Sequence, residues 1–319
     1  MSKSDISQQA SHEIFPRPAK GSAFGKVILV GEHAVVYGAR AVAIPLKSMR
    51  MELELLPNLT GEISLKLGGK ELSNRITDVV RDALKVMMLG PLPLSIRGKS
   101  SLPFGAGLGA SATLCIAILR TLANSVGIDL SQERLSRLGN ILEQRFHGSP
   151  SGLDTAIVAY EECIWFQKGK PAQPFTLPEP PEPKLGWHFA LIDSQVRAST
   201  LSMIQVAKPY FVHSQGESRI ARFDQLSQVV MKGLRDYDFG CVADALTEAS
   251  RLLTSAGVVT KQLKEIIADC ISHGALAAKP TGAGGGGTVL ALLDPTQAKF
   301  QLEKLKERYG LGNVFSVTV

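Results

Sequence analysis

A glycine-rich loop leads directly into a segment that is apolar on nearly every side. The loop Pro103–Ser111 reads PFGAGLGAS, and the apolar segment Ser111–Val126 follows it. Such a segment predicts a buried helix. Glycines permit positive φ angles, so successive N–H groups can curl inward, and the helix start adds unpaired N–H groups and a positive dipole end. This junction is typical of a phosphate-binding site, with the Ser111 hydroxyl placed to reach a phosphate oxygen or Mg²⁺.

Two other interpretations of this loop remain open. Gly105, Gly107 and Ala110 also fit the dinucleotide pattern GxGxxA, although residues 97–101 separate the predicted strand from the glycines and the expected acidic residue is missing. The loop can also be a flexible turn in which Ser111 caps the helix. A Walker loop is excluded because no Gly-Lys-Ser/Thr follows the glycines.

Two carboxylates flank a tight turn further along the chain. Glu143 lies at the end of the predicted helix Ser131–Phe146, and Asp154 follows the turn HGSPSG. Phosphoryl transfer from ATP needs an oxygen ligand for Mg²⁺ and benefits from a base at the attacking hydroxyl. Glu143 and Asp154 can divide those tasks. The alternative is a glutamate at a helix end and an aspartate that caps the next helix.

A second glycine run lies near the C-terminus. Lys279–Thr288 reads KPTGAGGGGT, and so many glycines favour close backbone approach to a phosphate or substrate over a simple hinge. Near the N-terminus, Lys26 opens the apolar strand KVILVG, and Glu32 and His33 follow it. A lysine beside Asp154 would favour the ionised carboxylate. Structural roles for these charged residues are the alternative.

Strands and helices alternate without a strict βαβ order, which predicts an α+β fold. A proline-rich segment over 171–184 is expected to join two halves, or to be a long loop within one half. The expected division is a flexible polar leader over 1–20, an N-terminal domain over 21–183 and a C-terminal domain over 184–319. The predicted strands are 26–31, 51–56, 92–96, 188–193, 288–293 and 314–319, and the predicted helices are 71–89, 111–126, 131–146, 217–235, 239–256, 260–273 and 296–308.

Composition narrows the class of partner. The 319 residues are 45% hydrophobic and 20% charged, which is ordinary for a globular protein, and no apolar run is long enough to cross a membrane. A net charge of +6 favours an anionic metabolite or nucleotide, although a solubilising surface explains it equally well. No basic block interleaved with aromatic residues indicates nucleic acid. The absence of a signal peptide and of CxxC spacing predicts a cytoplasmic protein with free thiols and no zinc.

Three segments together resemble the superfamily of galactokinase, homoserine kinase, mevalonate kinase and phosphomevalonate kinase. They are Lys26–Gly38 (KVILVGEHAVVYG), Pro103–Ser111 and Lys279–Thr288, in family order and spanning most of the chain. Within the superfamily, the first segment and HGSPSGLD (147–154) look most like mevalonate kinases. The resemblance implies an N-terminal domain like ribosomal protein S5 domain 2 and a ferredoxin-like C-terminal domain, with the active site between them. It also implies ATP-dependent phosphorylation of the primary 5-hydroxyl of mevalonate, with Mg²⁺, and leaves a homodimer open.

The resemblance implies a role for each matching residue. Asp154 would be the catalytic base, Lys26 its charged neighbour, and Ser111 and Glu143 the Mg²⁺ ligands. The residues implied at the ATP phosphates are Pro103, Gly105, Ala106, Gly107, Leu108, Gly109, Ala110 and Ser111. The residues implied at the substrate are Lys26, Glu32, His33, His147, Asp154, Thr281, Gly282, Ala283 and Gly284, and the run Gly282–Gly285 is expected to line the cleft.

The sequence departs from the family pattern at two places. Ala110 stands where family members usually have a first serine before Ser111, so one hydroxyl is lost. Asp193–Thr200 (DSQVRAST) matches the start of the family's C-terminal region only loosely. Two alternatives to a kinase that acts on mevalonate stay open. The chain could be a sugar or homoserine kinase of the same superfamily, or a catalytically silent ligand sensor on this scaffold.

Overall fold

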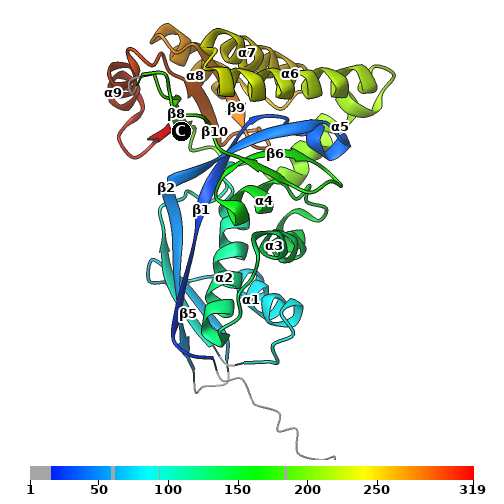
Figure 1. Ribbon diagram of the computed structural model, residues 1–319, viewed down its shortest axis with the longest axis vertical. Coiled ribbons are helices and arrows are strands. Elements are labelled where there is room, and N and C mark those ends of the chain that lie inside the picture. Colours follow the sequence, from blue (N-terminus) through cyan, green and yellow to red (C-terminus); the bar gives the residue numbers. More distant parts are fainter. Residues whose placement is uncertain (1–15, 59–61, 93, 183–184) are drawn as a thin grey trace, which may run out of the picture.

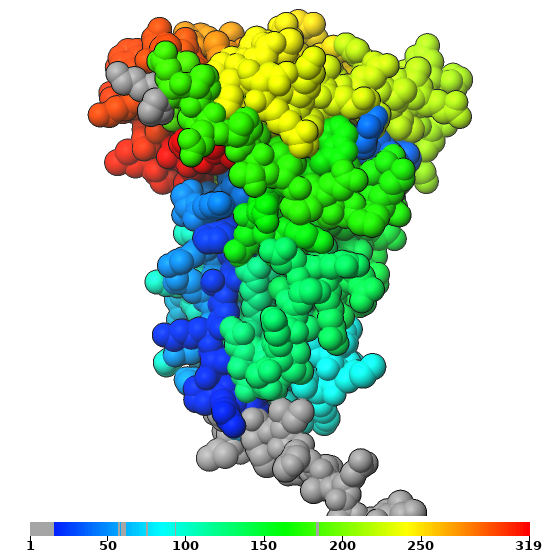
Figure 2. Space-filling model, in the orientation of Figure 1, coloured from blue at the N-terminus to red at the C-terminus, as the bar shows by residue number. Residues whose placement is uncertain are grey.

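The computed structural model describes residues 16–58, 62–92, 94–182 and 185–319. Its strands form two sheets with helices packed on each (Figure 1). Figure 2 shows the C-terminal segments, coloured yellow to red, gathered at the top of the molecule. The expected α+β class is confirmed. In the part of the chain that is described, no helix is both long and apolar enough to span a membrane.

The first sheet is built around one long strand, β2 (Arg40–Pro57). Strand β1 (Ala19–Val30) runs antiparallel along one edge of β2, and β5 (Leu94–Ser100) and β6 (Cys163–Gln167) pair with separate parts of the other edge. The remaining strands of this sheet are β3 (Ser64–Leu67), β4 (Lys70–Glu71) and β7 (Gln173–Phe175).

Helices cover one face of this sheet (Figure 1). Helix α2 (Ala110–Val126) packs directly on β1 and β2 and is buried on nearly every side, as its apolar sequence predicts. Around it lie α1 (Asn74–Val86), α3 (Gln132–His147) and the short α4 (Leu153–Tyr160). The Ser131 side chain caps α3 by accepting a hydrogen bond from the Arg134 N–H, as expected.

The second sheet has the order β11-β8-β10-β9 and is antiparallel throughout. Its strands are β8 (His188–Asp193), β9 (Ala277–Thr281), β10 (Thr288–Leu292) and β11 (Val314–Thr318). The helices of this half are α5 (Thr200–Val212), α6 (Gly216–Asp236), α7 (Phe239–Ser255), α8 (Lys261–Ser272) and α9 (Ala298–Tyr309). They form the upper part of the molecule in Figure 1.

Strand β1 belongs to both hydrophobic cores. Val27 and Leu29 pack with the core that includes the second sheet, while Ile28 packs with the core under α2. This division follows from the alternation of side chains along a strand. Lys26 and Glu32, near the end of β1, are therefore held where the two halves meet.

Several expectations differ from the structure. Most of the predicted leader, residues 1–15, lies outside the described residues, and β1 already begins at Ala19. The proline-rich segment contains β7, which pairs with β6 in the first sheet, and the expected boundary at 183–184 also lies outside the described residues. The apolar periodicity of the sequence did not predict α4, α5, β3, β4, β6, β7, β9 or the first half of β2.

Candidate active site

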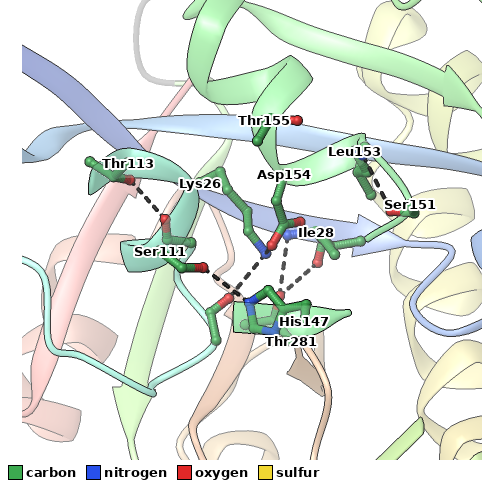
Figure 3. A network of polar contacts seen from close by, with 12 residues as sticks. Lys26, Ile28, Ser111, Thr113, His147, Ser151, Leu153, Asp154, Thr155 and Thr281 are labelled. Atoms are coloured by element: carbon green, nitrogen blue, oxygen red, sulfur yellow. Dashed lines mark hydrogen bonds and ion pairs between the residues drawn. The ribbon is translucent and has the colours of Figure 1, made fainter. Parts of the chain in front are cut away.

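A cleft of about 530 Å³ lies where the two halves meet. Its walls come from the end of β1, the glycine loop and start of α2, the turn between α3 and α4, the start of α5, and the turn after β9. Figure 3 shows Lys26, Ser111, His147, Asp154 and Thr281 gathered from these distant segments. The sequence-predicted site residues thus meet largely as expected.

The glycine loop adopts the curled form that its sequence predicts. Gly105, Gly107 and Gly109 have φ angles of 72°, 82° and 80°, in the left-handed region that favours glycine. Among the described residues, the N–H groups of these three glycines have no hydrogen-bond acceptor. Such a run of unpaired N–H groups ahead of a helix N-terminus is suited to an anion.

Three loop residues expected at the phosphates do not line the cleft. Ala106 and Leu108 point their side chains into the core, where they are 0% and 1% exposed, and Pro103 lies outside the lining. The side chains of Ala106 and Leu108 thus lie behind the loop, on the side away from the cleft. The lining is formed by Phe104, Gly105, Gly107, Gly109, Ala110 and Ser111.

Lys26 and Asp154 form the predicted ion pair. Lys26 Nζ lies 3.0 Å from Asp154 Oδ2 and donates to the Gly107 carbonyl at 3.2 Å (Figure 3). The lysine is buried, whereas the Asp154 side chain keeps 30% of its surface exposed in the first turn of α4. A Cβ at Gly109 would lie 2.8 Å from Lys26 Cγ, so glycine there leaves space for the lysine.

Ser111, Glu143 and His147 form a second polar group beside that pair. Ser111 Oγ lies 3.1 Å from both Glu143 Oε1 and His147 Nε2. Burial, and secondly the charge of Asp154, raise the pKa of Glu143 to about 8. Glu143 lies one turn before the end of α3 rather than at its last residue. A buried carboxylate next to a hydroxyl supplies the hard oxygen atoms that Mg²⁺ prefers, and its unfavourable burial would be relieved by a cation.

Glu32 and His33 lie at the opposite wall of the cleft. His33 Nε2 donates to the Ala283 carbonyl at 2.9 Å, and burial lowers the pKa of the imidazole. His33 also has φ 58°, a strained conformation for a residue with a side chain. One oxygen of Glu32 bonds to the fully buried Lys279, while its Oε2 has no partner among the described residues. Sequence reasoning missed Lys279 as a partner, because 247 residues separate it from Glu32.

The second glycine run contributes only two residues to the cleft, Gly282 and Ala283. Thr281, expected at the substrate, instead uses its hydroxyl on β1, where it accepts from the Ile28 N–H and donates to the Ile28 carbonyl. Gly284, also expected at the substrate, packs behind the cleft, since a Cβ there would lie 2.4 Å from the Val258 carbonyl oxygen. Gly285 likewise packs against Met203 instead of lining the cleft. The close backbone approach that the glycine run predicts is made to another part of the protein. The backbone of Thr281 and Gly282 packs against Gly107 of the glycine loop.

The loosely matching segment Asp193–Thr200 does reach the site. Ala198, Ser199 and Thr200 line the cleft at the start of α5. Arg197 forms a bidentate ion pair with Asp193 and donates through Nε to the Phe104 carbonyl at 2.9 Å. The motif RAST was visible in the sequence, but nothing in it indicated that the arginine would meet the glycine loop.

A larger hollow of about 850 Å³ lies elsewhere, over strands of the first sheet. Its charged walls are largely matched across the strands, as in the pairs Glu54–Arg97 and Glu52–Lys99. It contains neither the glycine loop nor the carboxylates singled out above. The smaller cleft is therefore the candidate active site.

Family models match both halves of the chain. Residues 74–162 match the GHMP kinases N terminal domain, and residues 230–311 match the GHMP kinases C terminal domain. The chain belongs to the GHMP kinases. The matched N-terminal region of this GHMP kinase includes the glycine loop and both carboxylates.

Individual relatives agree with this membership. Mevalonate kinase of Thermococcus gammatolerans is 28% identical over 309 residues, which cover 87% of this GHMP kinase and 90% of the relative. Among solved structures, L. major mevalonate kinase in complex with R-mevalonate has a TM-score of 0.79 at 20% identity, covering 95% of this chain and 98% of that one. Streptococcus pneumoniae phosphomevalonate kinase has a TM-score of 0.76 at 17% identity, covering 94% and 99%. The fold is therefore shared by kinases with different acceptors.

Proposed function

We propose that this GHMP kinase transfers the γ-phosphoryl group of ATP to the primary 5-hydroxyl of mevalonate, giving 5-phosphomevalonate and ADP. One observation carries the proposal: Asp154, paired with the buried Lys26, faces the same cleft as the unpaired N–H groups of the glycine loop. Relatives named mevalonate kinase along most of the chain support mevalonate as the acceptor.

The nucleotide phosphates would lie against the loop. The N–H groups of Gly105, Gly107 and Gly109 and the start of α2 would bind the phosphate oxygens, and the positive helix end would favour their negative charge. Ser111 and Glu143 would hold Mg²⁺, which neutralises charge that builds up on the phosphates during transfer. The Lys26 ammonium, 3.0 Å from Asp154, is close enough to stabilise the same charge.

Asp154 would act on the acceptor alcohol. As the oxygen of the hydroxyl forms its bond to phosphorus and the bond to ADP breaks, the Asp154 carboxylate would accept the hydroxyl proton. The part of Asp154 that remains exposed faces the cleft, so substrate can reach it. Glu32, His33 and His147 would contact the polar groups of the acceptor, with Gly282 and Ala283 lining the cleft beside His33.

A coupled ADP assay with a panel of alcohols tests the proposal. Purified protein with Mg-ATP should release ADP with mevalonate and not with galactose, homoserine or phosphomevalonate. Release with a sugar or homoserine instead would assign the chain to a sister activity. ATP binding with no turnover of any alcohol would support a silent sensor.

We further propose that the enzyme is cytoplasmic and acts on small molecules alone. All four cysteines are free thiols, and three of them are buried, which suits a reducing compartment. A homodimer is part of this proposal and rests on the family resemblance. Light scattering on the purified protein distinguishes one chain from two.

A further inference from the structure

The carbonyl groups of the glycine loop are bonded from outside the loop. The Phe104 carbonyl accepts from Arg197 Nε at 2.9 Å, and the Ala106 carbonyl accepts from the Thr288 hydroxyl at 2.8 Å. Lys26 bonds the next two carbonyls, that of Gly107 through its side chain and that of Leu108 through its N–H. Four of the five carbonyls from Phe104 to Leu108 thus have a donor that belongs to another segment.

The N–H groups on the cleft side of the loop, in contrast to its carbonyls, have no hydrogen-bond partner in the protein among the described residues. Among the described residues, the N–H groups of Gly105, Gly107 and Gly109 donate to nothing, and these three glycines line the cleft. An N–H group without an acceptor costs about as much as a lost hydrogen bond once water is excluded, so these groups favour a ligand that supplies acceptor atoms. The peptide units that join 104 to 105, 106 to 107 and 108 to 109 are therefore held by their oxygens, and the N–H groups of Gly105, Gly107 and Gly109 are left free for a ligand in the cleft.

Two of the external donors come from the second half of the molecule. Thr288 is the first residue of β10 and is fully buried, as is Ala106. Arg197 follows β8, and both of its terminal nitrogens lie 2.7 Å from the Asp193 carboxylate, which fixes the direction of Nε. Gly287 approaches the loop so closely that a Cβ on it would lie 2.9 Å from the Ala106 oxygen.

We propose that Thr288 and Arg197 are positioning residues of the second half that orient the glycine loop for the nucleotide phosphates. The inference rests on the proposed function, in which this loop holds ATP. It follows that the second half contributes to nucleotide binding without touching the nucleotide through these two side chains. The N–H groups of the loop would keep this orientation only while the two halves pack against each other.

Thr288→Val and Thr288→Ser form the matched test. Valine keeps nearly the shape of threonine and removes the donor to Ala106, whereas serine keeps the donor. We expect Thr288→Val to weaken Mg-ATP binding by about five- to tenfold, the equivalent of one net hydrogen bond. Thr288→Ser should bind Mg-ATP within about twofold of the wild-type protein, and KM for mevalonate should change little in either variant. Calorimetric titration with Mg-ATP and steady-state kinetics supply the readouts.

Thr121→Val is the control for loss of a buried threonine hydroxyl. Thr121 is also fully buried, and its hydroxyl bonds a backbone carbonyl, Ala117, inside α2 away from the cleft. It should leave Mg-ATP affinity unchanged. If Thr288→Val does not fold, Arg197→Lys replaces it, since it keeps a cation beside Asp193 and loses the Nε donor to Phe104. It too should raise KM for ATP more than KM for mevalonate.

The outcomes separate this inference from the proposed function. Wild-type affinity for Mg-ATP in Thr288→Val and Arg197→Lys would overturn the positioning role while leaving the kinase assignment intact. An equal rise in both KM values would also overturn it, because that pattern indicates general damage to the cleft. Wild-type protein that binds no Mg-ATP would refute the proposed function itself, and the inference with it.

Discussion

Asp154 combines two properties that a base for an alcohol needs, a cation at 3.0 Å and a surface open to the cleft. Asp154→Asn keeps the shape of the side chain and removes the proton acceptor. We expect kcat to fall by about 10²–10⁴-fold, the usual contribution of a general base, with a smaller change in KM for ATP. Steady-state kinetics with mevalonate measure it. Asp244→Asn, on the exposed side of α7, is the control, and a near-normal kcat in Asp154→Asn would remove this residue from the chemistry.

Glu143 gives the metal-free protein a specific dependence on pH. Its pKa is about 8 in the folded protein, because of burial and the nearby Asp154, and about 4.5 when unfolded. The folded state therefore holds a proton that the unfolded state releases, so the contribution of Glu143 to stability is complete below about pH 4.5 and is lost as pH rises toward 8.

Glu143→Gln removes this titration. The variant should gain stability relative to wild type as pH increases from about 5 to about 8. Denaturant midpoints of both proteins, measured without metal or nucleotide at several pH values, test the expectation. A difference in stability that stays constant over that range would contradict the assigned cause.

At the scale of elements, the glycine loop shows why particular glycines are required. Gly107 has φ 82°, and a Cβ there would lie 2.8 Å from the Thr281 carbonyl oxygen, whereas Gly127, with φ 70° at the end of α2, has open space around it. Gly127→Ala should therefore cost only the backbone strain, about 1 kcal/mol in unfolding free energy. Gly107→Ala should cost more and should also weaken ATP binding.

Thermal or denaturant unfolding of the two variants, with Mg-ATP titrations beside it, makes this comparison. Both alanines enter the same region of φ, so the backbone strain is matched. Equal losses of stability, with equal ATP affinity, would show that the close approach of Thr281 to the loop is not needed.

The elements that the sequence predicted are those whose stability is local. Helix α2 is apolar on nearly every side, α3 has one apolar face and a serine cap, and β8 was predicted over its actual bounds. Strand β9 was missed because Ala277–Thr281 contains Lys279 and Pro280, yet β9 is an edge strand, where a missing N–H is tolerated. Helix α5 was missed because Pro209 interrupts its pattern, and α4 because it has only 8 residues.

The site shows the same limit. Family motifs indicated Lys26, Ser111, Glu143 and Asp154, and the structure brings them into one cleft. The supporting contacts of Arg197, Thr288 and Lys279 could not be predicted. These three contacts join residues that are 93, 182 and 247 positions apart in the sequence, respectively. They therefore depend on how the two halves pack together and not on any local pattern.

At the scale of the whole molecule, one buried ion pair among the described residues connects the two halves beside the cleft. Lys279 Nζ, in β9, bonds Glu32 at the end of β1, and both side chains are at most 1% exposed. Burial raises the pKa of Glu32 and lowers that of Lys279, and the charge of each residue opposes the effect of burial on the other. Lys279 also donates to the Pro280 carbonyl, which leaves Glu32 Oε2 as the polar atom of the pair without a partner among the described residues.

Lys279→Met would leave the Glu32 carboxylate buried without a cation and should reduce the free energy of unfolding by about 3–5 kcal/mol. Adding Glu32→Gln removes the isolated charge, so the double variant should recover much of that loss although it lacks the ion pair. Denaturant unfolding of the single and double variants gives the coupling energy. Since the pair joins the halves that form the cleft, the double variant should unfold cooperatively yet show weakened substrate binding. Strictly additive losses would mean that the two charges do not depend on each other, and that the halves are held together by their apolar contacts alone.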